Sequence, residues 1–143
     1  MGDSVEQQYR RFLLVVSASI FAGSIIELVF VEHYEGAIQL VPFVLAAIGL
    51  IVVLAAMRSP GRRMLTGLRY LMWMIAAGGL FGVYEHLEHN YEFAVEIAPN
   101  ISTGEALIEM LYGASPFMAP GILCLGAILA YSATWRHPGL AAD

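Results

Sequence analysis

Residues 69–96 read RYLMWMIAAGGLFGVYEHLEHNYEFAVE, and this stretch changes from apolar to acidic partway along its length. It opens with Arg69, continues without charge to Tyr84, and then carries acids and histidines. No helix breaker occurs before Pro99, so one helix is predicted to run to about residue 98. An apolar helix with arginine at one end and acids at the other is typical of a segment that crosses a membrane.

Three further apolar runs accompany this stretch in a chain of 143 residues that is 59% hydrophobic and 13% charged. Each run supplies the ~20 residues that are needed to cross the hydrocarbon layer. Backbone polar groups in lipid must pair within the segment, so each run is predicted to be a helix. We expect a single four-span domain over residues 1–143, with spans at about 11–35, 37–57, 66–98 and 103–135.

The basic residues predict the orientation of these spans. All seven are arginines that flank one side of the apolar runs: Arg10, Arg11, Arg58, Arg62, Arg63, Arg69 and Arg136. Positively charged flanks stay in the cytoplasm, so both termini are predicted to be cytoplasmic. Short connections at 35–36 and 59–61 then predict an all-α, antiparallel, up-down four-helix bundle, with Gly36 just past the end of the first helix. The expected setting is the cytoplasmic (inner) membrane of a bacterium, with the acidic end facing the periplasm or exterior.

Two further patterns concern the packing and origin of the bundle. Gly78-Gly79-x-x-Gly82 predicts a close approach between the third helix and a neighbour, and Pro116, Pro120 and Gly121 predict a bend in the fourth span. The run Glu32-His33-Tyr34-Glu35 before Pro42 is similar to the run 88–92 before Pro99. This similarity indicates an internal duplication, in which two helical hairpins each contribute half of one polar site.

Two carboxylates are predicted to lie at similar depth in the membrane. Glu27 follows Arg11 by sixteen residues, and Glu85 follows Arg69 by the same number. A rise of 1.5 Å per residue places both about 24 Å above the inner arginines. The hydrocarbon layer is ~30 Å thick, so both carboxylates are expected just below its outer surface.

The acids beyond the third span fall on one face of the predicted helix. With Glu85 taken as zero and about 100° per residue, an acidic stripe with one histidine inside it is predicted. Its members are Glu85, Glu88, His89, Glu92 and Glu96. His86 points about 100° away from the centre of this stripe. On the next helix, Ser102-x-x-Glu105 has the form of a capping box, and Glu109 lies on the same face as Glu105.

These acids repel one another unless protons, a metal ion or arginine partners neutralise them. Arginine is absent on this side, and carboxylates with imidazoles suit Fe, Zn or Mn. We therefore expect one or two divalent metal ions at the outer end of the bundle, with redox chemistry or hydrolysis by an activated water as the reaction types to consider. The predicted ligands are Glu27, Glu32, His33, Glu85, Glu88 and His89, with Glu92 and Glu109 around them. The plan is analogous to that of ferritin-like di-iron bundles, although their Glu-x-x-His motif is absent from this sequence.

Other readings of the same residues remain open. Glu27 and Glu85 fit a proton- or cation-translocating site, and His33 with His86 or His89 fits the axial ligation of a haem. The outer acids also fit solvated helix ends of an accessory subunit in a larger membrane complex, or of a homo-oligomer. The lipid bilayer is the expected environment. Nucleic acid is not an expected partner, because the basic and acidic residues are segregated on opposite sides.

Overall fold

A computed structural model describes residues 4–141, and every regular element in this part of the chain is helical. The helices are α1 (Val5–Phe30), α2 (Val41–Arg58), α3 (Arg62–Ile97), α4 (Thr103–Tyr112) and α5 (Met118–Ser132), with short 3-10 turns at Ile38–Leu40 and Pro138–Leu140. The all-α prediction is confirmed. By length and composition, α1, the Ile38–Arg58 segment and α3 can each cross a membrane.

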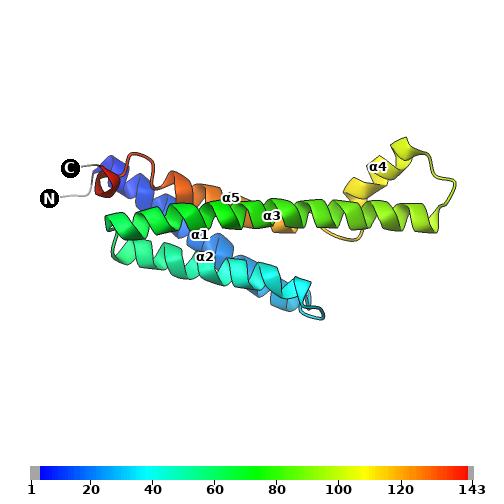
Figure 1. The fold of residues 1–143 in the computed structure, drawn as a ribbon, viewed down its shortest axis with the longest axis horizontal. Coiled ribbons are helices and arrows are strands. Elements are labelled where there is room, and N and C mark those ends of the chain that lie inside the picture. Colours follow the sequence, from blue (N-terminus) through cyan, green and yellow to red (C-terminus); the bar gives the residue numbers. More distant parts are fainter. Residues whose placement is uncertain (1–3, 142–143) are drawn as a thin grey trace.

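The helices form a bundle from which α3 projects (Figure 1). α1 packs against α2 and α5, while α3 packs against α2, α5 and α4. α1 and α3 therefore lie across the diagonal of the bundle. α3 continues beyond the ends of the other long helices, and α4 folds back along this projecting part (Figure 1). We call the projecting end of α3 together with α4 (residues 85–112) the outer hairpin. Both ends of the described chain lie at the end of the bundle opposite the outer hairpin (Figure 1).

The prediction of one helix across 103–135 is wrong. α4 ends at Tyr112 and α5 begins at Met118. Gly113 has an extended backbone, and Pro116 disfavours helical geometry at the residue before it, so the expected bend is a complete interruption. α5 is apolar but has only 15 residues, which gives a length of about 22 Å.

The end of the first helix also differs from expectation. α1 ends at Phe30, and Glu32 rather than Gly36 takes the left-handed position after it, with φ of 52°. The amide of His33 donates to the Leu28 carbonyl at 2.9 Å, and that of Glu32 donates to Val29 at 3.1 Å. These two bonds form a Schellman motif, which satisfies the last carbonyls of the helix. A non-glycine residue in this conformation costs about 1 kcal/mol, so the turn that presents His33 is held against local strain.

Close approaches of backbone and small residues hold the bundle together. Phe21 is fully buried, and its ring packs directly against Gly49. A Cβ atom added at Gly49 would lie only 2.7 Å from this ring. At Gly79, a Cβ atom would lie 2.9 Å from the Pro120 carbonyl oxygen and 3.0 Å from the Cys124 amide nitrogen. α3 and α5 are therefore in near backbone contact, as the glycine motif at 78–82 predicts.

Candidate metal centre

Two histidines from different parts of the chain meet at the acidic end of the bundle. His33 lies in the turn after α1, and His86 lies on α3. Their ring centroids are 6.3 Å apart, with 46° between the ring planes. Two imidazoles that share one metal ion at Zn–N distances near 2 Å have ring centroids about 5–6 Å apart. The observed centroid spacing is slightly longer than that range.

His86 is the more enclosed of the two histidines at its Nδ1 atom. The ring is half-buried, and its Nδ1 atom is buried without a hydrogen-bond partner among residues 4–141. The backbone carbonyl of Pro116 lies beside the ring, and such carbonyls commonly orient metal-binding imidazoles. A buried polar atom without a partner carries a cost of about 1–3 kcal/mol, which a bound cation would remove.

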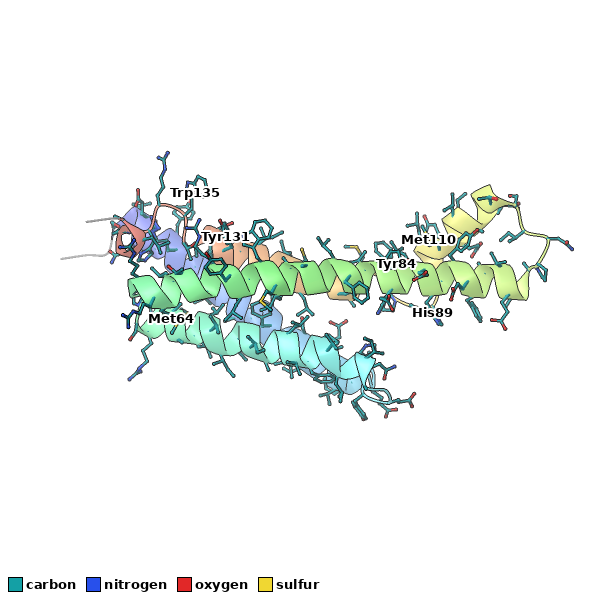
Figure 2. All side chains as sticks on the ribbon, viewed as in Figure 1. Met64, Tyr84, His89, Met110, Tyr131 and Trp135 are labelled. Carbon is teal, nitrogen blue, oxygen red and sulfur yellow. The ribbon has the colours of Figure 1, made fainter. Side chains whose placement is uncertain are left out.

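Of the two histidines on α3, the predicted acidic stripe favoured His89 as the one that faces the site. In the structure His86 is the more buried of the two. His86 continues the buried face of α3, which includes Met72, Gly79 and Asn90 at helical spacing. His89 is exposed and projects from α3 on the side away from α4 (Figure 2). The buried face could have been traced in the sequence by extending the apolar positions of the span in steps of three and four residues.

The structure does not gather the eight predicted ligands into one group. His33 is half-buried, and the other seven are exposed: Glu27, Glu32, Glu85, Glu88, His89, Glu92 and Glu109. Across residues 4–141, no three Asp, Glu, His or Cys side chains are placed to hold one metal ion together. The arrangement as it stands offers two neighbouring imidazole rings, with the Glu85 carboxylate near His86.

The angle of each residue around the axis of α3 shows which side chains lie near the histidine pair and which lie far from it. Measured from His86, His89 lies about 60° around the helix and Glu85 about 100°. Glu88 lies about 160° away on the opposite face, and Glu92 lies about 120° away and more than one turn further out. Glu85 and His89 can therefore approach the pair by side-chain rotation, whereas Glu88 faces away from it.

Asn90 joins α3 to the last turn of α4 and to the segment that follows it, a role that the sequence pattern did not reveal. Its amide nitrogen donates to the carbonyls of Met110, at 3.1 Å, and Ser115, at 2.9 Å. Its amide oxygen accepts from the Ser115 backbone N–H at 2.9 Å. Gly113 lies so close that an added Cβ atom would overlap the Asn90 side chain. Asn90 thus holds the base of the outer hairpin one turn beyond His86.

The rest of the outer hairpin agrees with expectation. α3 ends at Ile97, close to the predicted end, and the turn that follows leads into α4. Ser102 and Glu105 form the predicted capping box, in which the Ser102 side chain accepts from the Glu105 amide at 3.3 Å. The Glu105 carboxylate accepts hydrogen bonds from Ser102, and this lowers the pKa of Glu105. Glu105 is therefore engaged in the cap of α4 and lies outside the candidate metal centre.

No protein-family model, curated protein or solved structure matches this chain.

Proposed function

We propose that this chain is a multi-pass membrane protein that binds one divalent metal ion at the acidic end of its bundle, with His33 and His86 as the central ligands. In this proposal α1, α2, α3 and α5 form an antiparallel bundle in the bilayer. The arginine-rich end with both termini faces the cytoplasm, because positively charged flanks stay on that side. The histidine pair then lies at the outer surface.

The observation that carries the proposal is the His86 ring, whose centroid lies 6.3 Å from that of His33 and whose buried Nδ1 atom forms no hydrogen bond of good geometry in the described chain, although the Pro116 carbonyl lies near the ring. An unpaired nitrogen that is buried next to another histidine is costly without a cation. The Schellman turn at Glu32, which ends α1, fixes the position of His33 beside this ring.

Two imidazoles leave further positions open in the coordination shell of the ion. Glu85, His89 and Glu32 adjoin the pair in sequence and are exposed, so each is free to rotate toward it. Mixed imidazole and carboxylate ligands suit Zn, Fe or Mn. The remaining predicted acids, Glu27, Glu88, Glu92 and Glu109, form a negative surface that raises the local cation concentration.

Metal titration of the detergent-purified, metal-stripped protein tests this proposal. We expect one Zn²⁺ or Mn²⁺ site per chain, and His33→Ala and His86→Ala should each weaken it by at least about tenfold. Glu96→Gln is the matched control, because it removes a charge from the same acidic stripe away from the pair and should leave affinity within about twofold.

A helical spectrum and an unchanged melting temperature in the apo form will show that the two variants remain folded. His33 lies in a turn, so its removal provides a test that does not disturb the packing of α3. Wild-type affinity in both folded histidine variants would overturn the proposal. An equal loss in Glu96→Gln would also overturn it, because binding would then belong to the acidic surface as a whole.

The apolar surface of α4 favours a second role, as one subunit of a homo-oligomer. Leu107, Ile108, Leu111 and Tyr112 are exposed on a helix that lies in the outer hairpin. Apolar side chains on a helix outside the lipid are covered when two copies associate. Cross-linking in native membranes should give a dimer that Ile108→Glu removes. A monomer in both proteins would contradict this role.

A further inference from the structure

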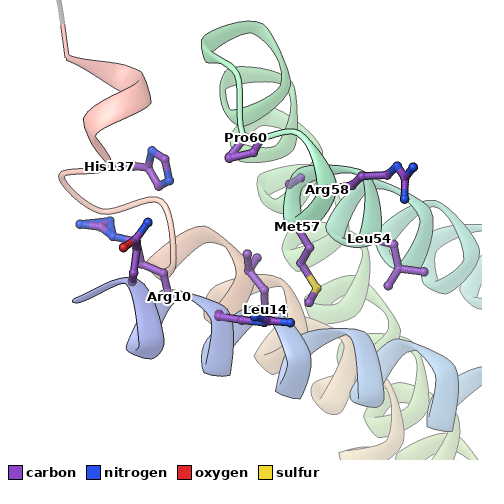
Figure 3. A pocket seen from close by; sticks show the side chains of 10 residues that line it. Arg10, Leu14, Leu54, Met57, Arg58, Pro60 and His137 are labelled. Carbon is purple, nitrogen blue, oxygen red and sulfur yellow. The ribbon is translucent and has the colours of Figure 1, made fainter. Parts of the chain in front are cut away.

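The arginine-rich end of the bundle contains a hollow that plays no part in the metal proposal. It has a volume of about 660 Å³ and lies between the start of α1, the end of α2 and the C-terminal segment (Figure 3). Arg10, Arg11 and Arg58 line it, together with His137. Arginine residues from two helices therefore line one space.

Two of the three guanidinium groups are available for a ligand. Arg10 is already engaged: it donates to the carbonyls of Trp135, at 2.9 Å, and Arg136, at 3.2 Å, and pairs with Glu6 at 3.3 Å. Across residues 4–141, neither Arg11 nor Arg58 forms an ion pair, and both are exposed. Arg10 thus fixes the C-terminal wall, while Arg11 and Arg58 present positive charge that no acid of the described chain neutralises.

The remaining walls of the hollow are apolar. Leu14 on α1 faces Leu54 and Met57 on α2, on the side of the hollow nearer the centre of the bundle (Figure 3). Leu54 is half exposed on the outer surface of α2. The site therefore combines a positively charged rim with an apolar base that continues onto a face covered by lipid in the proposed bundle. A free anion such as phosphate would leave this apolar base without a partner.

We propose that this hollow binds an anionic phospholipid from the cytoplasmic leaflet. The lipid phosphate lies between Arg11 and Arg58, and an acyl chain follows Leu14, Leu54 and Met57 toward the centre of the bilayer. Basic pockets between membrane helices on the cytoplasmic side suit anionic headgroups, and arginine forms bidentate hydrogen bonds with phosphate oxygens. This inference rests on the proposed membrane orientation and is independent of the metal centre.

Lipid titration of delipidated protein in a neutral detergent tests the inference, with intrinsic fluorescence or melting temperature as the readout. The probes are phosphatidylglycerol, phosphatidylcholine and inorganic phosphate, each added separately. We expect phosphatidylglycerol to bind at least about tenfold more tightly than phosphatidylcholine, and inorganic phosphate at millimolar concentration to produce no change.

Arg11→Gln with Arg58→Gln should reduce the affinity for phosphatidylglycerol by about 10- to 30-fold. The matched control is Arg62→Gln with Arg63→Gln, which removes the same charge at the start of α3, outside the hollow, and should change affinity by less than about twofold. His33→Ala should leave lipid affinity unchanged, which separates this result from failure of the metal proposal.

Three outcomes would overturn the inference. Equal losses in the two double variants would assign binding to the general charge of this end. Equal affinity for the two phospholipids would remove the role of the anionic headgroup. A response to inorganic phosphate as strong as that to phosphatidylglycerol would identify the hollow as a site for a free anion.

Discussion

The bundle and the outer hairpin are held together by different forces. In the bundle, α3 and α5 approach so closely at Gly79 that an added side chain would meet backbone atoms of α5. The Phe21 ring fills the space beside Gly49. In the outer hairpin, Asn90 joins the segments with three hydrogen bonds, and a capping box starts α4. Within lipid, where the bundle lies in our proposal, the hydrophobic effect does not draw helices together. Close packing must do so, with interhelical hydrogen bonds such as that from the Ser17 hydroxyl to the Gly126 carbonyl at 2.8 Å. In the outer hairpin, which projects beyond the lipid in this proposal, directional polar contacts contribute more.

The largest effect is expected from filling the contact between α3 and α5. Gly79→Leu would place side-chain atoms against the Pro120 carbonyl and the Cys124 amide, and neither backbone group can move without displacing α5. We expect a loss of about 3 kcal/mol or more in the free energy of unfolding. Thermal or denaturant melting of the detergent-solubilised protein measures this loss.

Gly67→Ala is the control for this substitution, because nothing lies within 4 Å of an added Cβ atom at that position on the same helix. Its melting temperature should match or exceed that of the wild type, because alanine favours helix more than glycine does. Similar melting of Gly79→Leu and the wild type would show that steric fit does not hold the bundle.

A more local effect is expected in the outer hairpin. Asn90→Leu removes three hydrogen bonds, worth about 3 kcal/mol at roughly 1 kcal/mol each, and leaves the backbone groups of Met110 and Ser115 unpaired. Hydrogen exchange should accelerate across residues 98–117, while exchange in α1 and α2 stays as in the wild type.

Asn100→Ser, in the exposed turn before α4, is the matched control and should leave exchange across 98–117 unchanged. Faster exchange throughout the bundle in Asn90→Leu would contradict the separation of the two regions. Unchanged exchange in the hairpin would show that Asn90 does not hold it.

The sequence predicted the bundle more completely than the candidate site, and the reason is physical. Long apolar runs must become helices in lipid, so three of the four expected spans are present as apolar helices of sufficient length. Pro116 predicted a bend in the fourth span, but the bonds from Asn90 to Ser115 that fix the full break are tertiary contacts between distant residues. The sequence analysis named His86 only as a possible haem ligand and not as a metal ligand, because the acids define an obvious stripe. Its position four residues before Asn90 nevertheless continues the buried face.

At the arginine-rich end of the bundle, Arg10 holds the C-terminal segment by hydrogen bonds, as Asn90 holds the hairpin. Burial lowers the pKa of His137 below its ordinary value of 6.5, and the nearby charge of Arg10 lowers it further. Arg10→Gln removes the second cause, so the pKa of His137 should rise toward 6.5. Titration of the His137 imidazole followed by NMR measures this change.

The sign of the accompanying pH effect follows from the lowered pKa. As pH falls through 6.5, the unfolded chain takes up a proton at His137 before the folded chain does, so the free energy of unfolding should decrease. The decrease should end once pH lies below the pKa of the folded state, and it should be smaller in Arg10→Gln. An imidazole that titrates at or above 6.5 in the wild type would contradict the burial of this ring.

The metal centre is tested most directly by counting the imidazoles that coordinate a bound ion. Cu²⁺ binds nitrogen ligands strongly, and electron spin-echo spectroscopy detects each coordinated imidazole. We predict at least two imidazoles in the wild type, one fewer in His33→Ala and one fewer in His86→Ala, and no change in His137→Gln at the opposite end. A count that both of the first two substitutions leave unchanged would contradict the account.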